Sequence, residues 1–337
     1  MEMTLGGTSL LVPVRDASQI GEARRAAVRF GVALGFDEAD TGKLAIVATE
    51  AAANLARHGH GGDLLLRRAD GAGLAIEVLA LDRGPGIVDV AHAFEDGHST
   101  GGTPGTGLGA IRRLSAACEL FSAPGAGTAL MARLVADRPR APGVTMEIGA
   151  VSLPIAGETV CGDGWAVAFT PRGATAMVVD GLGHGPSAAL AAQEAVRIFS
   201  GESRGRPREI IEAIHGALRA TRGAALGVAE IDTEARSVTF AGVGNIAGTI
   251  LGPGFARSTV SLGGIVGHEF RRAQEFHYPW PEGAVLVMHS DGLQSQWKLD
   301  AYPGLAECHP ALISGILYRD YSRGRDDVTV LALRETR

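Results

Sequence analysis

Residues 178–189 read Val-Val-Asp-Gly-Leu-Gly-His-Gly-Pro-Ser-Ala-Ala. A short apolar run ends in Asp180, a glycine-rich turn follows, and the alanine-rich segment after Pro186 has the composition of a helix. A carboxylate at the C-terminal tip of a strand suits a hard cation, and the glycines let backbone carbonyls approach the same point. The alternative is a strand, a turn and a helix with an incidental Asp. Other aspartates in similar turns favour the cation site.

The overall composition is that of a globular protein with room for two domains. The chain has 337 residues, of which 46% are hydrophobic and 20% charged. A net charge of −6 without a basic stripe argues against a nucleic-acid partner. The widely spaced Cys118, Cys161 and Cys308 disfavour a disulfide framework and a cysteine zinc site. Without an apolar run of membrane-spanning length or a leader pattern, the sequence predicts a cytoplasmic protein with no membrane partner.

A linker-like segment divides the chain. Residues 137–143, Asp-Arg-Pro-Arg-Ala-Pro-Gly, have the composition of an exposed connection. We therefore expect a first domain over residues 1–137, a linker over 138–145 and a second domain over 146–337. Both domains are predicted to mix helices and strands, which gives an α/β (α+β) fold class.

In the first half, a polar stripe lies on a helix predicted over residues 37–57. Glu50, Asn54 and His58 stand at i, i+4 and i+8 and therefore share one face among alanines. An amide oxygen can ligate Mg²⁺, and a neighbouring carboxylate can act as a general base. A solvated helix face is the alternative interpretation.

Two glycine motifs follow. In Asp82-x-Gly84-x-Gly86, an acid at a strand end can accept a hydrogen bond from a base amine, although a plain turn has the same composition. Residues 101–109, Gly-Gly-Thr-Pro-Gly-Thr-Gly-Leu-Gly, lead into a helix predicted over 107–117. Backbone N–H groups at a helix N-terminus bind phosphate. The loop is neither a Walker loop nor a Rossmann fingerprint.

Together these motifs resemble the GHKL ATPase fold over roughly residues 10–135. The likeness is greatest to the small bacterial anti-sigma and switch kinases of the RsbT type. It implies that Glu50 is the catalytic base, Asn54 holds Mg²⁺ and Asp82 reads adenine. The implied ATP-binding set is Asn54, Asp82, Gly84, Gly86, Ser99 and Thr100 in the lid, Gly105, Gly107, Gly109, and Thr128 at the closing Gly-Thr position. Such kinases phosphorylate Ser or Thr on a STAS-domain partner, such as a stressosome or anti-anti-sigma protein.

In the second half, four aspartates stand in or beside turns. They are Asp163 in Gly-Asp-Gly, Asp180, Asp291 in Ser-Asp-Gly, and Asp326 in Asp-Asp-Val-Thr. If the strand ends converge, these carboxylates cannot all stay ionised without a cation, because like charges raise each other's pKa. Oxygen-only ligation indicates Mn²⁺ or Mg²⁺, and two such ions would clamp a phosphate and activate a shared water.

In this order, and with Gly-Val-Gly-Asn-Ile at residues 242–246, the motifs resemble the type 2C protein phosphatases. The likeness spans about residues 146–335 and is greatest to the SpoIIE-like branch and the RsbX type. It implies that Asp180 bridges the metals and is catalytic, that Gly181 offers its carbonyl, and that Asp163, Asp291 and Asp326 complete the shell.

Some neighbouring residues receive a different interpretation. Asp327 is a weaker candidate for a metal ligand than Asp326. Relatives often carry a second acid three residues after the one at position 163, and here that residue is Ala166, which weakens the case for a peripheral metal. His184 could donate a proton to the leaving serine, but a turn role is favoured. His289, inside an apolar strand, is predicted to be a core histidine.

We therefore expect a bacterial signalling protein with a GHKL ATPase α/β sandwich followed by a type 2C phosphatase α/β/β/α sandwich. The first domain would use ATP and Mg²⁺ to phosphorylate a STAS-domain protein, and the second would remove phosphate from Ser or Thr with Mn²⁺ or Mg²⁺. Two alternatives remain open for the first domain: an ATP-dependent anti-sigma or partner-binding clamp without phosphate transfer, and an ATP sensor that regulates the phosphatase.

Overall fold

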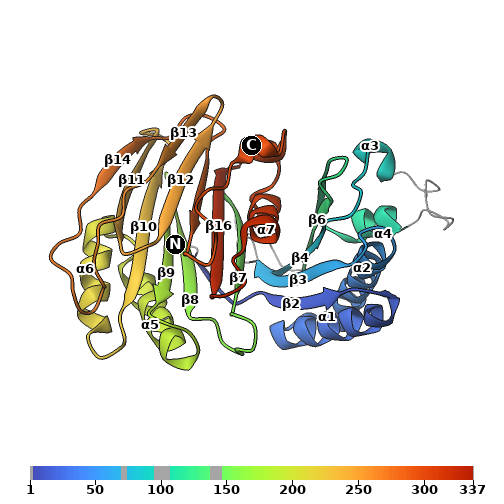
Figure 1. Ribbon diagram of the computed structural model, residues 1–337, viewed down its shortest axis with the longest axis horizontal. Coiled ribbons are helices and arrows are strands. Elements are labelled where there is room, and N and C mark those ends of the chain that lie inside the picture. The colour runs from blue at the N-terminus through green and yellow to red at the C-terminus, as the bar shows by residue number, and fades with distance from the viewer. Residues whose placement is uncertain (1–2, 70–73, 95–106, 137–145, 337) are drawn as a thin grey trace. The chain divides into compact units, whose positions relative to one another are not determined.

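The computed structural model describes residues 3–69, 74–94, 107–136 and 146–336 (Figure 1). Contacts divide the chain into two compact units, Ser9–Ala141 and a second that joins Met1–Thr8 to Pro142–Arg337. The linker predicted over 138–145 lies outside the described residues.

The first unit is an α/β sandwich built on one antiparallel sheet. Its strand order is β2-β3-β4-β6-β5. The strands are β2 (Leu10–Val14), β3 (Gly62–Ala69), β4 (Ala75–Asp82), β5 (Ala117–Ser122) and β6 (Thr128–Val135). The helices are η1 (Ala17–Gln19), α1 (Ile20–Leu34), α2 (Glu38–Arg57), α3 (Val90–Ala93) and α4 (Gly107–Leu114).

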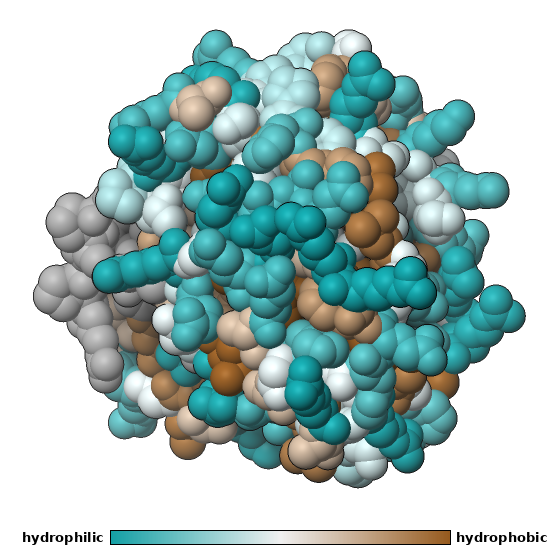
Figure 2. Space-filling model, turned by 90° about the vertical axis from the view of Figure 1, so that its left-hand side faces the viewer, coloured by the Kyte–Doolittle hydropathy of each residue, from teal (hydrophilic) through white to brown (hydrophobic). Residues whose placement is uncertain are grey.

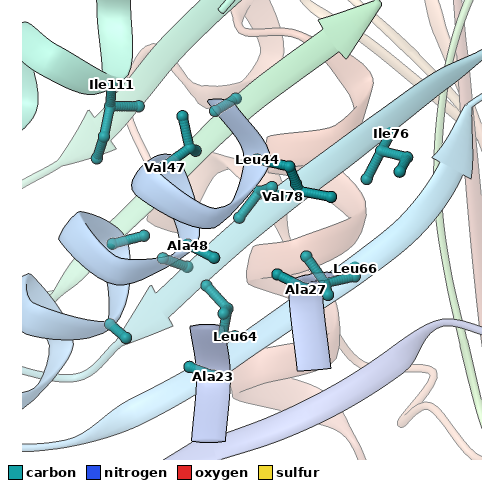
Figure 3. Packing of buried hydrophobic residues seen from close by; sticks show 14 of the residues in the cluster. Ala23, Ala27, Leu44, Val47, Ala48, Leu64, Leu66, Ile76, Val78 and Ile111 are labelled. Atoms are coloured by element: carbon teal, nitrogen blue, oxygen red, sulfur yellow. The ribbon is translucent and has the colours of Figure 1, made fainter. Parts of the chain in front are cut away.

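Small side chains hold the helices close to this sheet. Figure 3 shows Ala23 and Ala27 of α1 and Ala48 of α2 packed with leucines and valines of α2 and the sheet. The N-terminus of α2 is fixed by Asp37, whose carboxylate accepts a hydrogen bond from the Asp40 N–H at 2.8 Å. Because the buried alanines are small, the helices pack closely against the sheet, and this packing fixes the position of α2, which carries Glu50, Asn54 and His58.

The second unit has four layers, helices–sheet–sheet–helix. The six-stranded sheet has the order β1-β8-β9-β10-β11-β14 and the five-stranded sheet β13-β12-β15-β16-β7. The first contains β1 (Met3–Leu5), β8 (Asp163–Thr170), β9 (Gly173–Gly181), β10 (Ala224–Asp232), β11 (Ser237–Val243) and β14 (Phe276–Pro279). The second contains β7 (Met146–Leu153), β12 (Ala247–Gly252), β13 (Phe255–Ser258), β15 (Val285–His289) and β16 (Val328–Glu335).

Helices cover the outer faces of both sheets. Helices α5 (Pro186–Glu202) and α6 (Pro207–Leu218) pack on the six-stranded sheet, and α7 (Pro310–Tyr321) packs on the five-stranded one. The short helices η2 (Leu299–Ala301) and η3 (Leu305–Glu307) precede α7. Between the sheets lies an apolar core that includes Trp165, Phe169, Phe240 and Met288. The predicted fold class, an α/β sandwich followed by an α/β/β/α sandwich, is confirmed.

The first strand of the chain belongs to the second unit. Strand β1 pairs with β8 in the register Met3↔Ala168 and Leu5↔Ala166, and the Gly6 N–H donates to the Trp165 carbonyl at 2.9 Å. The first domain predicted over residues 1–137 includes this strand, which tertiary contacts assign to the second unit. A three-residue strand has too little pattern to reveal its partner sheet.

No helix of the described residues is long and apolar enough to cross a membrane.

The face of the second unit that carries α6 and β14 is mostly hydrophilic, and its hydrophobic residues form small patches (Figure 2).

Candidate functional site

Strand ends bring the four predicted aspartates of the second unit to one edge of its two sheets. Asp163 begins β8 and faces Asp180, near the end of β9, directly across the strand pair. Asp291 follows the end of β15, and Asp326 precedes the start of β16, which is the neighbour of β15. The Ser290 hydroxyl donates to Asp163 Oδ2 at 2.6 Å and thereby ties the two sheets together at this edge.

The electrostatics of this acidic cluster are unfavourable without a cation. Burial, followed by the charges of Asp291 and Asp326, raises the pKa of Asp180 to about 7. Burial and the charge of Asp180 raise the pKa of Asp163 well above its usual range. Burial also raises the pKa of Asp326, and the charge of Asp291 adds to the effect. The negative charge of these three carboxylates is therefore poorly compensated by the protein, and a bound cation would stabilise it.

The donor set fits a hard divalent cation. The residues that would hold Mn²⁺ or Mg²⁺ are Asp163, Asp180, Asp291, Asp326 and the carbonyl of Gly181. Within the described parts of the chain, no three His, Cys, Asp or Glu side chains already stand close enough together to hold an ion, so the carboxylates would have to close around one. When bound, such ions clamp phosphoryl oxygens and lower the pKa of a water.

Glycine is required at position 181, where the end of β9 meets α5. A Cβ at this position would lie 2.2 Å from the Ala188 carbonyl oxygen. Any side chain would therefore push the turn away from the helix and displace Asp180.

The Asp327 carboxylate is occupied by backbone hydrogen bonds. Its two oxygens accept the N–H groups of Ile155 and Gly162 at 2.7 and 2.8 Å, and its side chain is buried. These bonds fix the loop that leads into Asp163. The ranking of Asp327 below Asp326 stays a prediction, and the occupied oxygens of Asp327 support it.

Three supporting residues were not among the predicted site residues. Ser290 bonds Asp163, and the Asn245 amide donates to Asp291 Oδ2 at 2.8 Å. Thr329 N–H donates to Ser290 Oγ at 3.0 Å and orients that hydroxyl. Asn245 and Ser290 lie inside the Gly-Val-Gly-Asn-Ile and Ser-Asp-Gly phrases, so the sequence contained a signal for them, but their partners depend on the tertiary fold.

The two histidines of this region differ. His289 is buried, bonds the Ser290 carbonyl through Nδ1 at 2.8 Å and accepts from Trp297 Nε1 at 3.1 Å. Burial lowers its pKa, and Nε2 carries no proton because it accepts the Trp297 N–H, so the ring supports the turn that carries Asp291. His184 is exposed, does not cap α5, and contacts Glu158 Oε1 through Nδ1 at 2.8 Å. Its ring therefore faces a carboxylate at the rim of the acidic cluster, and the turn itself depends on the flanking glycines.

In the first unit, Glu50, Asn54 and Gly107 come together where α2 meets the start of α4. A Cβ at Gly107 would lie 2.8 Å from Glu50 Oε2 and 3.8 Å from Asn54 Oδ1. Asn54 Nδ2 is buried and has no hydrogen-bond partner among the described residues. Because a buried amide seldom remains unpaired, this atom fits a ligand that supplies an oxygen acceptor.

Asp82 ends strand β4 of the same unit, where the Asp-x-Gly-x-Gly turn begins. Its Oδ1 accepts the Gly84 N–H at 2.8 Å and the Thr128 N–H at 3.1 Å. Gly86 has φ +76°, and a Cβ there would lie 2.1 Å from the Ala123 carbonyl oxygen. The predicted Asp-x-Gly-x-Gly turn and the Gly-Thr position are therefore adjacent in space.

These groups fit ATP with Mg²⁺. Asn54 would offer its amide oxygen to the ion and its unpaired amide N–H to a phosphate, and Glu50 would offer a carboxylate beside it. Gly107 and Gly109 lie in the first turn of α4. The remaining predicted contacts, Ser99, Thr100 and Gly105, lie outside the described residues.

Comparison with family models assigns both halves of the chain. Residues 13–134 match the histidine kinase-like ATPase domain, and residues 170–336 match stage II sporulation protein E (SpoIIE).

Two curated proteins of Bacillus subtilis (strain 168) are similar to different parts of the chain. The serine/threonine-protein kinase RsbT is 34% identical over 100 residues, which is 29% of this chain and 75% of the kinase. The phosphoserine phosphatase RsbX is 26% identical over 141 residues, which is 41% of this chain and 69% of the phosphatase.

Two solved structures share a fold with part of the chain. A protein from a study of the bacterial stressosome as a modular system controlling secondary messenger signalling is 28% identical, with a TM-score of 0.53, and the match covers 56% of this chain and 99% of that one. RsbX in complex with magnesium is 19% identical, with a TM-score of 0.51, and the match covers 57% of this chain and 96% of that one. At this identity the second likeness shows the fold alone.

Proposed function

The chain belongs to the histidine kinase-like ATPase and SpoIIE families, with one domain of each, and we propose that it sets the phosphorylation state of a partner protein. The C-terminal domain is of the type 2C phosphatase class. In this proposal it removes phosphate from Ser or Thr of a STAS-domain protein, and the N-terminal domain adds phosphate from ATP.

The acidic cluster carries the phosphatase proposal. Asp163, Asp180, Asp291 and Asp326 meet at one edge of the sandwich, and three of them have a raised pKa. One buried and three half-buried carboxylates that repel one another suit two divalent cations that bind phosphate. Asn245, Ser290 and Asp327 hold this set in place through the hydrogen bonds described above.

The kinase proposal is supported by the groups around Asn54. Glu50 stands beside the start of α4, where backbone N–H groups would receive the phosphates. Its carboxylate would accept the proton of the attacking Ser or Thr hydroxyl. The similarity to a serine/threonine kinase over this domain points to a hydroxyl acceptor.

The resemblance to the RsbT type and a similar structure from a stressosome study support a STAS-domain protein as the partner. Two opposed activities on one chain would make the phosphorylation level of the partner depend on ATP supply and on metal supply.

Glu50→Gln is expected to lower phosphate transfer by at least about a hundredfold, because the amide cannot take the hydroxyl proton while its shape is retained. ATP affinity should change by less than about threefold. Transfer of label from γ-labelled ATP to a purified STAS-domain protein measures the first effect, and equilibrium dialysis with ATP and Mg²⁺ measures the second. Glu38→Gln, an exposed change on the same helix, is the matched control.

Two outcomes would contradict kinase activity. If wild type never labels the partner but ATP changes the rate of dephosphorylation, the domain is a sensor. If ATP only strengthens binding of the partner, the domain is a clamp.

A further inference from the structure

A surface cavity of about 450 Å³ lies beside the acidic cluster of the second unit. It is lined by Gln294, Ser295, Gln296, Arg323 and Arg325. Its two walls are the segment that follows Asp291 and the segment that precedes Asp326. The cavity therefore shares its supporting loops with two of the proposed metal ligands.

Hydrogen bonds hold the two walls in a fixed relation. The Arg323 N–H donates to the Gly292 carbonyl at 2.8 Å, and the Gln294 N–H donates to the Tyr321 carbonyl at 3.0 Å. At the far end of the first wall, buried Trp297 donates to His289 at 3.1 Å. The cavity is thus pre-formed, which lowers the entropic cost of binding.

The charge of the cavity is opposite to that of the molecule. Net charge is −6, yet the side chains of Arg323 and Arg325 are exposed and make no ion pair with any described residue. Other arginines of this unit, such as Arg236 and Arg334, do pair with glutamates at 2.8 and 2.7 Å. A guanidinium presents a planar set of donors that matches carboxylate and phosphate oxygens.

The simplest alternative is that these arginines offset the charge of the acidic cluster. Neither is paired with Asp291 or Asp326, although both arginines lie in the segment just before Asp326 and that segment is hydrogen-bonded to the one after Asp291. Gln294, Gln296 and Ser295 add neutral hydrogen-bonding groups, which a purely compensating charge would not need.

We propose that this cavity binds acidic side chains that flank the phosphorylated residue of the protein substrate. The inference rests on the proposed phosphatase function and adds a specificity determinant to it. With the phosphate at the acidic cluster, an extended substrate chain would carry its neighbouring residues across the adjacent cavity. Arg323 and Arg325 would pair with their carboxylates and would also steer an acidic partner toward an otherwise negative protein.

The test compares two synthetic phosphoserine peptides that differ only in three residues beside the phosphoserine, either three glutamates or three glutamines. With the full chain and Mn²⁺, we expect kcat/KM to be about tenfold higher for the glutamate peptide, as two exposed ion pairs can provide. Arg323→Gln/Arg325→Gln should reduce this ratio to below about twofold, mainly through KM. High salt should reduce the wild-type ratio as well.

Arg204→Gln/Arg219→Gln is the matched control, because it removes the same charge at the two ends of α6 and should keep the ratio. A wild-type ratio near one, or an equal loss on both peptides in the Arg323/Arg325 variant, would overturn the inference while leaving the phosphatase in place.

Failure of wild type to dephosphorylate either peptide would instead overturn the proposed function. Binding then decides the inference: fluorescence anisotropy should show weaker affinity of the Arg323/Arg325 variant for the glutamate peptide only. Equal affinities of wild type and variant would contradict it.

Discussion

Asp180→Asn is expected to lower metal-dependent phosphatase activity by more than about a hundredfold, since even outer-shell partners of a metal commonly account for 10–100-fold. Asp180 faces Asp163 across β8 and β9 and carries the charge that the proposed ions neutralise. The amide keeps the volume but loses the negative charge. Phosphate release from a phosphoserine peptide with Mn²⁺ measures the effect.

Asp300→Asn, an exposed change in η2, is the matched control and should retain full activity. The affinity of the first domain for ATP should be unchanged in both variants. An Asp180→Asn protein with more than about a tenth of wild-type activity would contradict the role of Asp180 as a metal ligand.

The second large effect is a loss of stability of the metal-free protein as pH rises. The folded-state pKa of Asp180 is about 7, against 3.8 for the ordinary carboxyl. Between these values the unfolded chain releases a proton that the folded state retains, so stability falls as pH rises from about 4 to 7. A difference of about three pKa units corresponds to up to about 4 kcal/mol.

Asp163 and Asp326, whose pKa values are also raised, act in the same direction. Thermal unfolding in EDTA should therefore show a melting transition that falls by on the order of 10 °C across this pH range. Mn²⁺ should restore it, with more effect at pH 7.5 than at pH 5, because the ligands must be deprotonated.

Asp180→Asn should make the metal-free transition less dependent on pH. A metal-free melting temperature that stays level or rises between pH 4 and 7 would contradict the proposed electrostatics of the cluster.

The convergence of the four aspartates at one sheet edge was predictable because each stands next to a strand that the sequence pattern identifies. Asp163, Asp180, Asp291 and Asp326 border β8, β9, β15 and β16, and an antiparallel sandwich brings such ends to one edge. The glycines beside Asp180 and Asp291 mark the turns. Glu50 and Asn54 were predictable as neighbours for a different reason, because their spacing of four residues sets them on one face of a helix.

Other features were not predictable because their signal is weak or lies in tertiary contacts. Strand β2 contains Pro13, which normally argues against a strand, but β2 is an edge strand of its sheet, where a missing N–H is tolerated. The helix predicted over 107–117 ends at Leu114, because Ala117 already belongs to β5.

The arginine-lined cavity was not predictable either, because tertiary contacts form it. The segments around Gln294 and Arg323 are separated in sequence and become neighbours through the backbone bond from Arg323 to Gly292. No local pattern marks either arginine. Likewise, the hydrogen bonds of Asp327 to Ile155 and Gly162 depend on loops far from it in sequence.

The most direct test of the proposed phosphatase is phosphate release by the purified full chain from a phosphoserine STAS-domain protein, measured with Mn²⁺ and with EDTA. We expect release in Mn²⁺, its loss in EDTA and its recovery when the metal is returned. Absence of release in Mn²⁺ from this protein and from phosphoserine peptides, or release that is equal in EDTA, would contradict this proposal.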